Sequence, residues 1–191
     1  MITLKERQFQ LREDTIIEAM HRLLIQKGYA ATTMDDVAAE VGISKATLYL
    51  HFKSKDELVL KVVVQNLEKA EASIWLIDQS LPASERFQRA LENGIRYRAS
   101  MGSTQIEDVP QAIHKDPAFQ KARRRARESV DALIREMQQE GSIRADVSPA
   151  LIQQFVVSIF GIDYERLLKN GASVDELVAQ LVDMVMRAIR P

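Results

Sequence analysis

Apolar residues recur at spacings of three and four along most of this chain, and that spacing restricts its fold more than any other feature of the sequence. It places side chains on one face of an α-helix, whereas no window shows the sustained alternation that a half-buried strand requires. The 191 residues include only 7 glycines and 5 prolines, so few positions interrupt a helix. We therefore expect an all-α protein.

The composition argues against several classes of protein. There is no cysteine, which rules out disulfides and thiolate chemistry, and the three histidines share no spacing typical of metal ligands. The charged N-terminus does not resemble a signal peptide, and the longest apolar run, FVVSIFGI at residues 155–162, is too short to cross a membrane. We expect a cytoplasmic protein that needs no membrane, metal or cofactor.

A short helix is expected within TTMDDVAAEVG, residues 32–42. Thr32 or Thr33 can accept a hydrogen bond from the first helical turn, and Asp35 or Asp36 can bond back as the reciprocal partner of a capping box. The glycine that closes this segment provides a tight turn and ends the helix.

A third helix follows at once in the segment SKATLYLHF, with Ser44 as its cap. Leu48 and Phe52 lie four positions apart in it and face one core. A longer helix precedes both short ones and is expected to end at Gly28. Two short helices joined by a glycine turn, with a third helix completing the core, predict a helix-turn-helix.

The remaining helices suggest a second, larger domain. Serines are expected to cap three of them: Ser54 and Ser173 in capping boxes with Glu57 and Glu176, and Ser148 before a proline in the first turn. A long helix, about residues 55–79, is interpreted as the link between a DNA-binding domain at residues 1–55 and a helical domain at residues 56–191. The last two long helices, about residues 149–169 and 173–189, are apolar around most of their circumference. That width predicts a buried hairpin or a subunit interface, and at a chain end we favour the interface of a homodimer.

Residues 28–63, GYAATTMDDVAAEVGISKATLYLHFKSKDELVLKVV, resemble the DNA-binding domain of the TetR family of transcriptional regulators. The resemblance covers about a fifth of the chain. One departure is Ala46, where the family often has glycine. The resemblance implies a sequence-specific regulator, usually a repressor, with a larger domain for effector binding and dimerisation. The family pattern is filled by Gly28-Tyr29, Thr32-Thr33, Val41 to Ser44, Thr47-Leu48-Tyr49, His51-Phe52 and Ser54-Lys55.

The fifteen residues from Val41 to Lys55 contain no acid, and this is consistent with a helix that approaches DNA phosphates. The first turn of the third helix is expected to meet base edges, and the residues after it phosphates; the resemblance adds a phosphate contact at the start of the second helix. Tyr49 could instead be a core residue, and the two lysines after it ordinary solvated side chains. The expected DNA-binding residues are Thr33, Ser44, Lys45, Ala46, Thr47, Tyr49, His51, Lys53 and Lys55.

Residues 1–60 hold eight Lys or Arg and nine Asp or Glu, so this region lacks strong overall basicity. Few phosphate contacts per subunit are then available, and binding to double-stranded DNA is expected to need a dimer on an inverted repeat.

The resemblance also implies a sensing role, in which a small-molecule effector binds among the central helices and moves the linking helix. The two DNA-binding domains of the dimer then no longer fit successive major grooves. The candidates for an effector pocket are the large side chains of this region, each of which could equally be plain core. They are Trp75, Phe87, Tyr97, Met101, Phe119, Phe155 and Tyr164.

A conspicuous basic run, KARRRAR at residues 121–127, is interpreted as a solvated helix face. Glu128 and Asp131 lie within pairing range of Arg124 and Arg127 on the same helix. A direct contact of this run with DNA is the less favoured alternative.

Two other classes of function compete with a DNA-binding regulator. An enzyme would have to use an acidic cluster that lacks a nucleophile motif, a phosphate loop or metal spacing, and we do not expect one. A helical adaptor would explain the apolar terminal helices but not the acid-free segment. The cluster consists of Glu107, Asp108, His114, Lys115 and Asp116.

Overall fold

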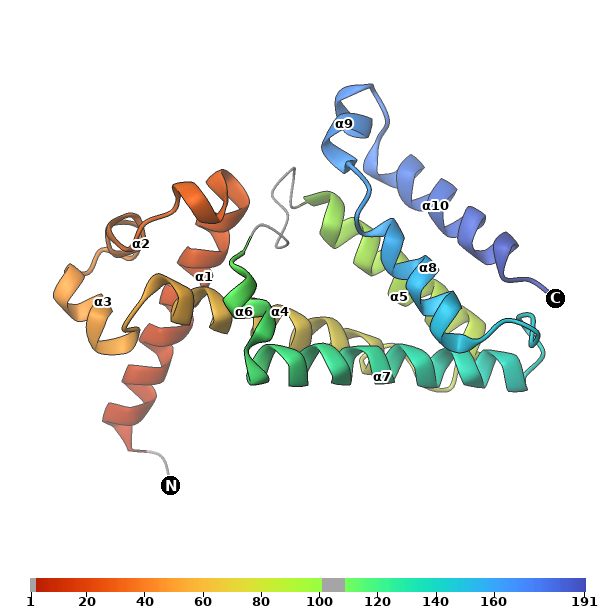
Figure 1. Cartoon of the computed structure of the whole chain (residues 1–191), viewed down its shortest axis with the longest axis horizontal. Helices are drawn as coiled ribbons and strands as arrows, with labels where there is room; N and C mark the ends of the chain where they lie inside the picture. The colour runs from red at the N-terminus through yellow and green to blue at the C-terminus, as the bar shows by residue number, and fades with distance from the viewer. Residues whose placement is uncertain (1–2, 101–108) are drawn as a thin grey trace. The chain divides into compact units, whose positions relative to one another are not determined.

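The computed structural model describes residues 3–100 and 109–191. These residues form α-helices and irregular connections and contain no strand, which confirms the all-α prediction (Figure 1). No helix within the two described ranges is both long enough and apolar enough to cross a membrane. Met101, a candidate for the effector pocket, and Glu107 and Asp108 of the acidic cluster lie outside the described residues.

The chain divides into two compact units. Unit 1 holds the described residues of Met1–Asn66 and Thr104–Lys121, and unit 2 those of Leu67–Ser103 and Ala122–Pro191. The helices in unit 1 are α1 (Leu4–Ala31), α2 (Met34–Val41), α3 (Lys45–His51), the first part of α4 (Lys55–Trp75), α6 (Gln111–Lys115) and the start of α7 (Pro117–Gln139). Unit 2 holds the remainder of α4 and α7 together with α5 (Ala83–Ser100), α8 (Pro149–Ile159), α9 (Tyr164–Lys169) and α10 (Val174–Ala188).

Local capping sets the boundaries of α1 and α2. Gly28 has a φ of 76° and interrupts α1, so the predicted end at this residue is a break after which helical structure continues to Ala31. The cap of α2 is Thr33, whose hydroxyl accepts from the Asp36 amide at 3.1 Å while the Asp36 carboxylate accepts from the Thr33 amide at 2.7 Å. Thr32 is buried, and its hydroxyl donates to the Gly28 carbonyl at 2.7 Å. The structure thus selects one of the two caps that the sequence left open.

The core of unit 1 holds α3 in place. Leu48 is fully buried and Phe52, the residue that ends α3, is 2% exposed. Both belong to the buried apolar side chains of unit 1, which come from α1, α2, the α3 segment and the first turns of α4, as their spacing predicted. This core includes Ile16, Ile17, Met20, Leu23, Leu24, Met34, Val37, Ala38, Leu48, Phe52, Leu58, Val59, Val62 and Val63.

The linking helix α4 is shorter than predicted, because it ends at Trp75 and not near residue 79. The side-chain amide of Gln79 donates hydrogen bonds to the carbonyls of Ile74, Trp75 and Ile77 at 3.2, 3.3 and 2.6 Å. These bonds satisfy carbonyl groups that another helical turn would have used. The apolar periodicity continues past this point, so spacing alone overestimated the length.

At the other end of α4, Ser54 caps the helix through the Glu57 amide at 3.1 Å, as expected. The Glu57 carboxylate accepts from the Lys53 amide at 2.7 Å, one residue before the cap. The reciprocal bond is therefore displaced by one residue from the predicted capping box.

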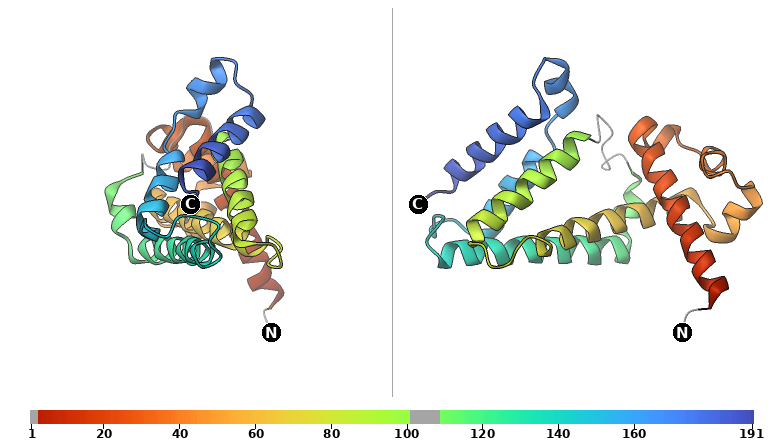
Figure 2. Two further views of the ribbon diagram at one scale, coloured as in Figure 1. Left: turned by 90° about the vertical axis from the view of Figure 1, so that its right-hand side faces the viewer. Right: turned by 180° about the vertical axis from the view of Figure 1, so that it is seen from behind.

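Unit 2 is a helical bundle in which α5 packs against α10; the two run next to each other in the views of Figure 2. Gly94 allows a close approach on α5, since a Cβ at this position would lie 2.9 Å from Cε1 of Phe160. The core side chains include Phe87, Leu91, Ile95, Leu133, Ile134, Met137, Ile152, Val156, Ile159, Tyr164, Leu177, Val178, Val182 and Val185.

The helix predicted at residues 149–169 is two helices. α8 begins at the predicted Ser148 cap but ends at Ile159, and α9 begins after Asp163, whose carboxylate accepts from the Arg166 amide at 3.0 Å. The Arg98 side chain donates to the Phe160 carbonyl at 3.0 Å and so satisfies the C-terminal end of α8. This contact joins residues far apart in the sequence, and apolar spacing could not reveal it.

Tyr164 is a core residue of unit 2. It is 1% exposed, and its hydroxyl donates to the Ile159 carbonyl at 3.0 Å across the break between α8 and α9. The side chain therefore stabilises both the core and the break.

We predict that Tyr164→Ala lowers the free energy of unfolding by about 3–5 kcal/mol, because it removes a buried aromatic ring. Tyr164→Phe keeps the ring and is expected to cost about 1 kcal/mol, the value of the lost hydrogen bond. Denaturant unfolding followed by circular dichroism measures both variants. Equal losses in the two would contradict a packing role for the ring.

Candidate nucleic-acid interface

The turn between α2 and α3 sets the direction of α3. Gly42 has a φ of 75° and ends α2 in the left-handed conformation, which residues with a Cβ rarely adopt. Ser44 then caps α3 by accepting from the Thr47 amide at 3.1 Å. Two short helices with this turn between them, completed by α1, form a helix-turn-helix.

One face of α3 is exposed and lies opposite the buried Leu48. It carries Lys45, Ala46, Tyr49 and Leu50, all of them exposed, with Tyr49 at 43% and Leu50 at 78%. The alternative that Tyr49 is a core residue does not agree with this exposure. Three of these four residues were expected to contact DNA, but Leu50 was not, because an apolar residue gives no signal for such a contact in the sequence.

The ammonium of Lys45 is paired in this structure. Its Nζ lies 2.8 Å from the Asp35 carboxylate at the start of α2, and this hydrogen bond and charge raise the pKa of Lys45. Both side chains are more than half exposed, so solvent screens the pair and its net stabilisation is small. Breaking this pair therefore costs little.

The hydroxyl groups of the interface also bond within unit 1. The Ser44 and Thr47 hydroxyls lie 2.8 Å apart, and the Thr33 hydroxyl donates to the Asp36 carboxylate at 2.6 Å. Lys27 adds a salt bridge to Asp36 at 2.8 Å. The hydrogen bonds from Lys27 and Thr33 lower the pKa of Asp36 to about 2. The cap of α2 is therefore charged at neutral pH.

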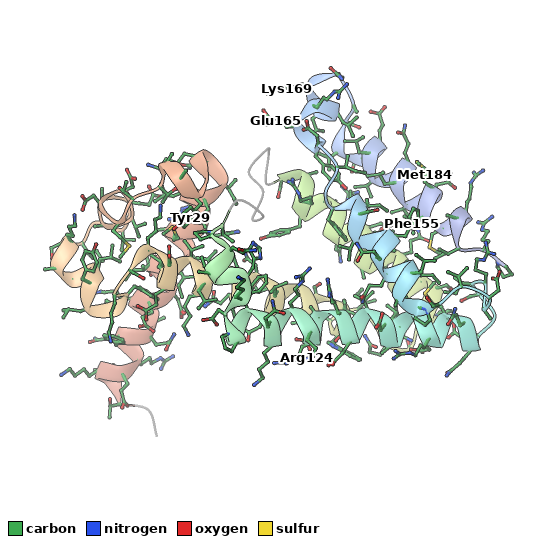
Figure 3. All side chains as sticks on the ribbon, in the orientation of Figure 1. Tyr29, Arg124, Phe155, Glu165, Lys169 and Met184 are labelled. Carbon is green, nitrogen blue, oxygen red and sulfur yellow. The ribbon has the colours of Figure 1, made fainter. Side chains whose placement is uncertain are left out.

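Lys55 braces α4 against the end of α1. Its ammonium donates to the carbonyls of Tyr29 and Thr32 at 2.9 and 3.1 Å and lies 3.8 Å from the centre of the Tyr29 ring. The Tyr29 hydroxyl in turn donates to Asp56, and burial together with this carboxylate raises the pKa of Tyr29 to about 12 (Figure 3). Two of the three ammonium donors of Lys55 are thus used inside the protein, which indicates a structural role that the sequence analysis missed.

His51 turns its ring inward. The ring stacks on Phe9 with centroids 4.1 Å apart, and only 4% of the His51 side chain is exposed. Its Nδ1 lies 3.7 Å from a Glu13 oxygen, beyond hydrogen-bond distance. This placement does not suit the predicted phosphate contact, because a phosphate cannot reach a covered ring.

A groove with a volume of about 750 Å³ lies beside His51, between the first turns of α1 and the turn after α2. Two cations that the sequence analysis did not select, Lys5 and Arg12, line it. Lys53 lies near the C-terminal end of the acid-free segment, and its side chain is exposed.

The candidate effector residues fall into two groups. Phe87 and Tyr164 belong to the core of unit 2, and Phe119 is buried in unit 1, where its ring meets that of His114 edge-on. Trp75, Tyr97 and Phe155 are 55%, 47% and 42% exposed. Unit 2 therefore keeps Phe87 and Tyr164 inside its core and leaves the other three at its surface.

The basic run on α7 lacks the expected partners. Arg125 pairs with Glu71 at 3.3 Å, and Asp131 lies 4.0 Å from Arg135, so neither of the two predicted pairs, with Arg124 or with Arg127, forms. Arg124 extends away from the α7 ribbon in Figure 3. The run is exposed, as predicted, but its charges are balanced less than the sequence suggested.

Among residues 3–100 and 109–191, no group of three or more His, Cys, Asp or Glu side chains is placed to hold a metal ion. The interface described above consists of a capped helix with an exposed, acid-free face on a helix-turn-helix. That combination is characteristic of the class of DNA-binding proteins.

Comparison with known proteins supports this class. A family model described as bacterial regulatory proteins of the tetR family matches residues 16–62. The uncharacterized HTH-type transcriptional regulator YvaF of Bacillus subtilis (strain 168) is 30% identical over 184 residues, which cover 91% of this chain and 93% of that relative. The biofilm operon icaADBC HTH-type negative transcriptional regulator IcaR of Staphylococcus aureus (strain Newman) is 30% identical over 125 residues, covering 56% of this chain and 67% of that relative.

Other matches are partial or concern the fold alone. Two further curated regulators are matched over only 17% and 38% of their own lengths. The crystal structure of the regulator FadR from Bacillus subtilis in complex with stearoyl-CoA has a TM-score of 0.73 at 16% identity, with 93% of this chain and 99% of that chain covered. At this identity the likeness shows a shared fold.

The chain belongs to the TetR family of bacterial transcriptional regulators. The nearly full-length match to YvaF, together with the family model over the helix-turn-helix, carries this assignment. Its relatives are regulators, which confirms the expectation that the chain is not an enzyme.

The pKa of Asp36 leads to a prediction about acid stability. A free aspartate has a pKa of about 3.9, whereas that of Asp36 in the fold is lowered to about 2. The carboxylate therefore stabilises the fold at pH values above that of the free group, and this contribution is lost as the pH falls toward the folded value. We expect the unfolding free energies of wild type and Asp36→Asn to differ most near neutral pH and to converge at acid pH.

Denaturant unfolding over a series of pH values measures this convergence. Lys27→Met is a matched variant, because it removes the cation and leaves the Thr33 cap intact; its curve should lie between those of wild type and Asp36→Asn. Parallel curves for wild type and Asp36→Asn would contradict a perturbed Asp36.

Proposed function

We propose that this regulator is a dimeric repressor that binds an inverted-repeat operator through α3 and leaves it when a small-molecule effector binds unit 2. The observation that supports DNA reading most directly is the exposed face of α3, formed by Lys45, Ala46 and Tyr49 opposite the buried Leu48. A helix fits the major groove of B-form DNA, where its first turn can reach base edges.

We assign base reading to Lys45, Ala46 and Thr47, with Ser44 setting the orientation of the first turn through its cap. Lys45 would break its solvent-exposed salt bridge with Asp35 and donate to a base acceptor. A good bidentate contact of this kind discriminates between bases by about 1–3 kcal/mol.

We assign phosphate contacts to Thr33, Tyr49 and Lys53. Thr33 begins α2, whose amide groups and positive helix end favour an anion. Tyr49 and Lys53 are exposed on and just after α3. Lys55 keeps one ammonium donor for a phosphate at most, since two are bonded to carbonyls, and the covered ring of His51 is left out of the set.

Dimerisation is proposed through α8 and α10. Each helix buries one apolar face in unit 2 and exposes further apolar residues, with Leu151 at 61%, Phe155 at 42%, Val157 at 41% and Met184 at 64% (Figure 3). Exposed apolar residues grouped on two helices of one unit are typical of subunit interfaces. A dimer also supplies a second DNA-binding domain. This compensates for the few phosphate contacts that the nearly neutral residues 1–60 of one subunit can make.

The proposed effector site lies in unit 2. Of the candidate residues, Trp75 and Tyr97 are exposed and have polar atoms that could meet a ligand. IcaR is named as a negative regulator, and FadR was crystallised with stearoyl-CoA, so repression and an organic ligand are known among proteins similar to this one. An effector that favours the released conformation by about 1–3 kcal/mol would weaken operator binding about 5- to 150-fold. We place this activity in the cytoplasm.

Selection of the purified protein on random duplex DNA at moderate salt tests the proposal. Enrichment of an inverted repeat with half-sites about one helical turn apart is expected. The recovered operator then serves as the probe for small molecules that release the protein. Lys45→Ala should recover a sequence with relaxed preference at one or two positions, and failure of the wild type to enrich any sequence would refute operator binding.

Lys53 and Lys55 are expected to respond differently to replacement by alanine. Lys53→Ala should flatten the slope of log affinity against log salt by about 0.9 per phosphate lost, with little change in stability. Lys55→Ala removes a partly buried ammonium bonded to two carbonyls and should lower the free energy of unfolding by about 1–2 kcal/mol. Salt titrations of DNA binding and thermal unfolding of both variants separate the two roles; a stable Lys55→Ala protein with a flattened slope would return Lys55 to the phosphate set.

The dimer proposal predicts that charges on α8 and α10 separate the subunits. Leu151→Lys together with Met184→Lys should convert the protein to a monomer and abolish tight operator binding while leaving each unit folded. Leu76→Lys, at an 85% exposed leucine outside these helices, is the control and should remain dimeric. Sedimentation equilibrium measures the mass, and a dimeric double variant would place the interface elsewhere.

A further inference from the structure

The exposed face of α3 carries an apolar strip that polar recognition does not explain. Ala46 and Leu50 lie four positions apart, which brings their side chains next to each other on one side of the helix. Ala46 is exposed, and Leu50 is 78% exposed. Leu48, in contrast, is fully buried on the opposite side and already anchors the helix. Leu50 therefore contributes little to the core of unit 1.

Three polar side chains of α3 and its cap bond within unit 1. Lys45 pairs with Asp35 at 2.8 Å, and the hydroxyls of Ser44 and Thr47 lie 2.8 Å apart. An operator must exchange these bonds for its own, and the net gain of such an exchange is small. For Ala46 and Leu50 no existing bond has to be exchanged. Contact with any apolar surface removes them from water, which is favourable.

The major groove offers one apolar group to a side chain, the C5-methyl group of thymine. The remaining groups that distinguish the bases there are hydrogen-bond donors and acceptors, and cytosine presents only a C5 hydrogen where thymine has its methyl group. A leucine facing those edges without a methyl group would remove water from polar atoms and replace no hydrogen bond. The chemistry of this strip therefore matches thymine and disfavours the other three bases at the same position.

We propose that Ala46 and Leu50 together read the methyl group of a thymine in each operator half-site, so that Leu50 is a specificity-determining residue. This inference rests on the proposed function, in which α3 enters the major groove. It adds a chemical requirement to the operator: an inverted repeat with one thymine per half-site whose methyl group is essential for full affinity.

Single exposed leucines are common on protein surfaces, and exposure alone would not distinguish Leu50. The distinguishing observation is its place on the seven-residue α3, one turn after Ala46 on the face that also carries Lys45. Leu76, which is 85% exposed in unit 2, serves as the comparison leucine. Leu76→Ala makes the same chemical change away from α3.

Replacement of thymine by deoxyuridine provides the test, because it removes the methyl group and keeps every hydrogen-bonding atom. The operator recovered with wild-type protein is prepared with one thymine at a time replaced in both half-sites. Burial of one methyl group is worth about 0.8 kcal/mol, so wild-type affinity should fall about fourfold per half-site and about fifteenfold for both at one symmetric position.

The same duplexes are bound to Leu50→Ala and to the control Leu76→Ala. Leu50→Ala should bind the thymine and deoxyuridine forms of that position equally, whereas Leu76→Ala should discriminate as the wild type does. Because Leu50 is exposed, Leu50→Ala is expected to unfold at the wild-type temperature, and thermal unfolding confirms that it is folded. A parallel Ala46→Gly variant should lose part of the discrimination.

Two outcomes overturn the inference alone. In one, the wild type binds its operator but no deoxyuridine replacement weakens it. In the other, a replacement weakens the wild type and Leu50→Ala by the same factor, which would assign the methyl contact to another residue. Failure of the wild type to select any operator removes the proposed function and this inference together, and the selection step distinguishes that case from the first two.

Discussion

The burial of Leu48 and Phe52 is the interaction on which the reading surface depends. Helix α3 has only seven residues, and isolated helices shorter than about 12–15 residues are marginal in water. Its stability therefore comes from the core of unit 1, where each fully buried side chain of this size contributes about 1.5–3 kcal/mol. The left-handed Gly42 and the Ser44 cap then determine which face of α3 points away from that core. The DNA contacts proposed for α3 depend on this orientation.

The electrostatics of unit 1 are balanced before DNA is bound. Asp35 holds Lys45, Asp36 holds Lys27, and the carbonyls of α1 hold Lys55. Residues 1–60 carry eight Lys or Arg and nine Asp or Glu, so cations such as Lys45 must release an acidic partner before they can contact DNA. In the proposed dimer, sequence preference would come from the few positions where the replacement is favourable, and affinity from the two DNA-binding domains acting together.

The parts of this protein that were predictable from the sequence depend on neighbours along the chain. Helix caps at Ser44, Ser148 and Ser173 involve residues three positions away, and the structure places all three as expected. The break between α8 and α9 was not predictable, because Arg98 stabilises it from a helix far away in the sequence. The predicted end of α4 was wrong for a related reason. The Gln79 side chain donates to carbonyls at the end of the helix in place of backbone amides, and apolar spacing contains no information about that.

The sequence by itself determined the all-α class, the helix-turn-helix and the acid-free segment, because periodicity, glycine turns and charge are properties of short stretches. Only the tertiary structure decided what each cation and aromatic ring does. Lys55 and His51 fit the pattern of phosphate contacts, yet one is bonded to carbonyls of α1 and the other lies under Phe9. Leu50 gave no signal in the sequence and is exposed beside Ala46. The physical reason is that partners and solvent exposure depend on packing between helices, and a side chain's type does not specify what the fold places against it.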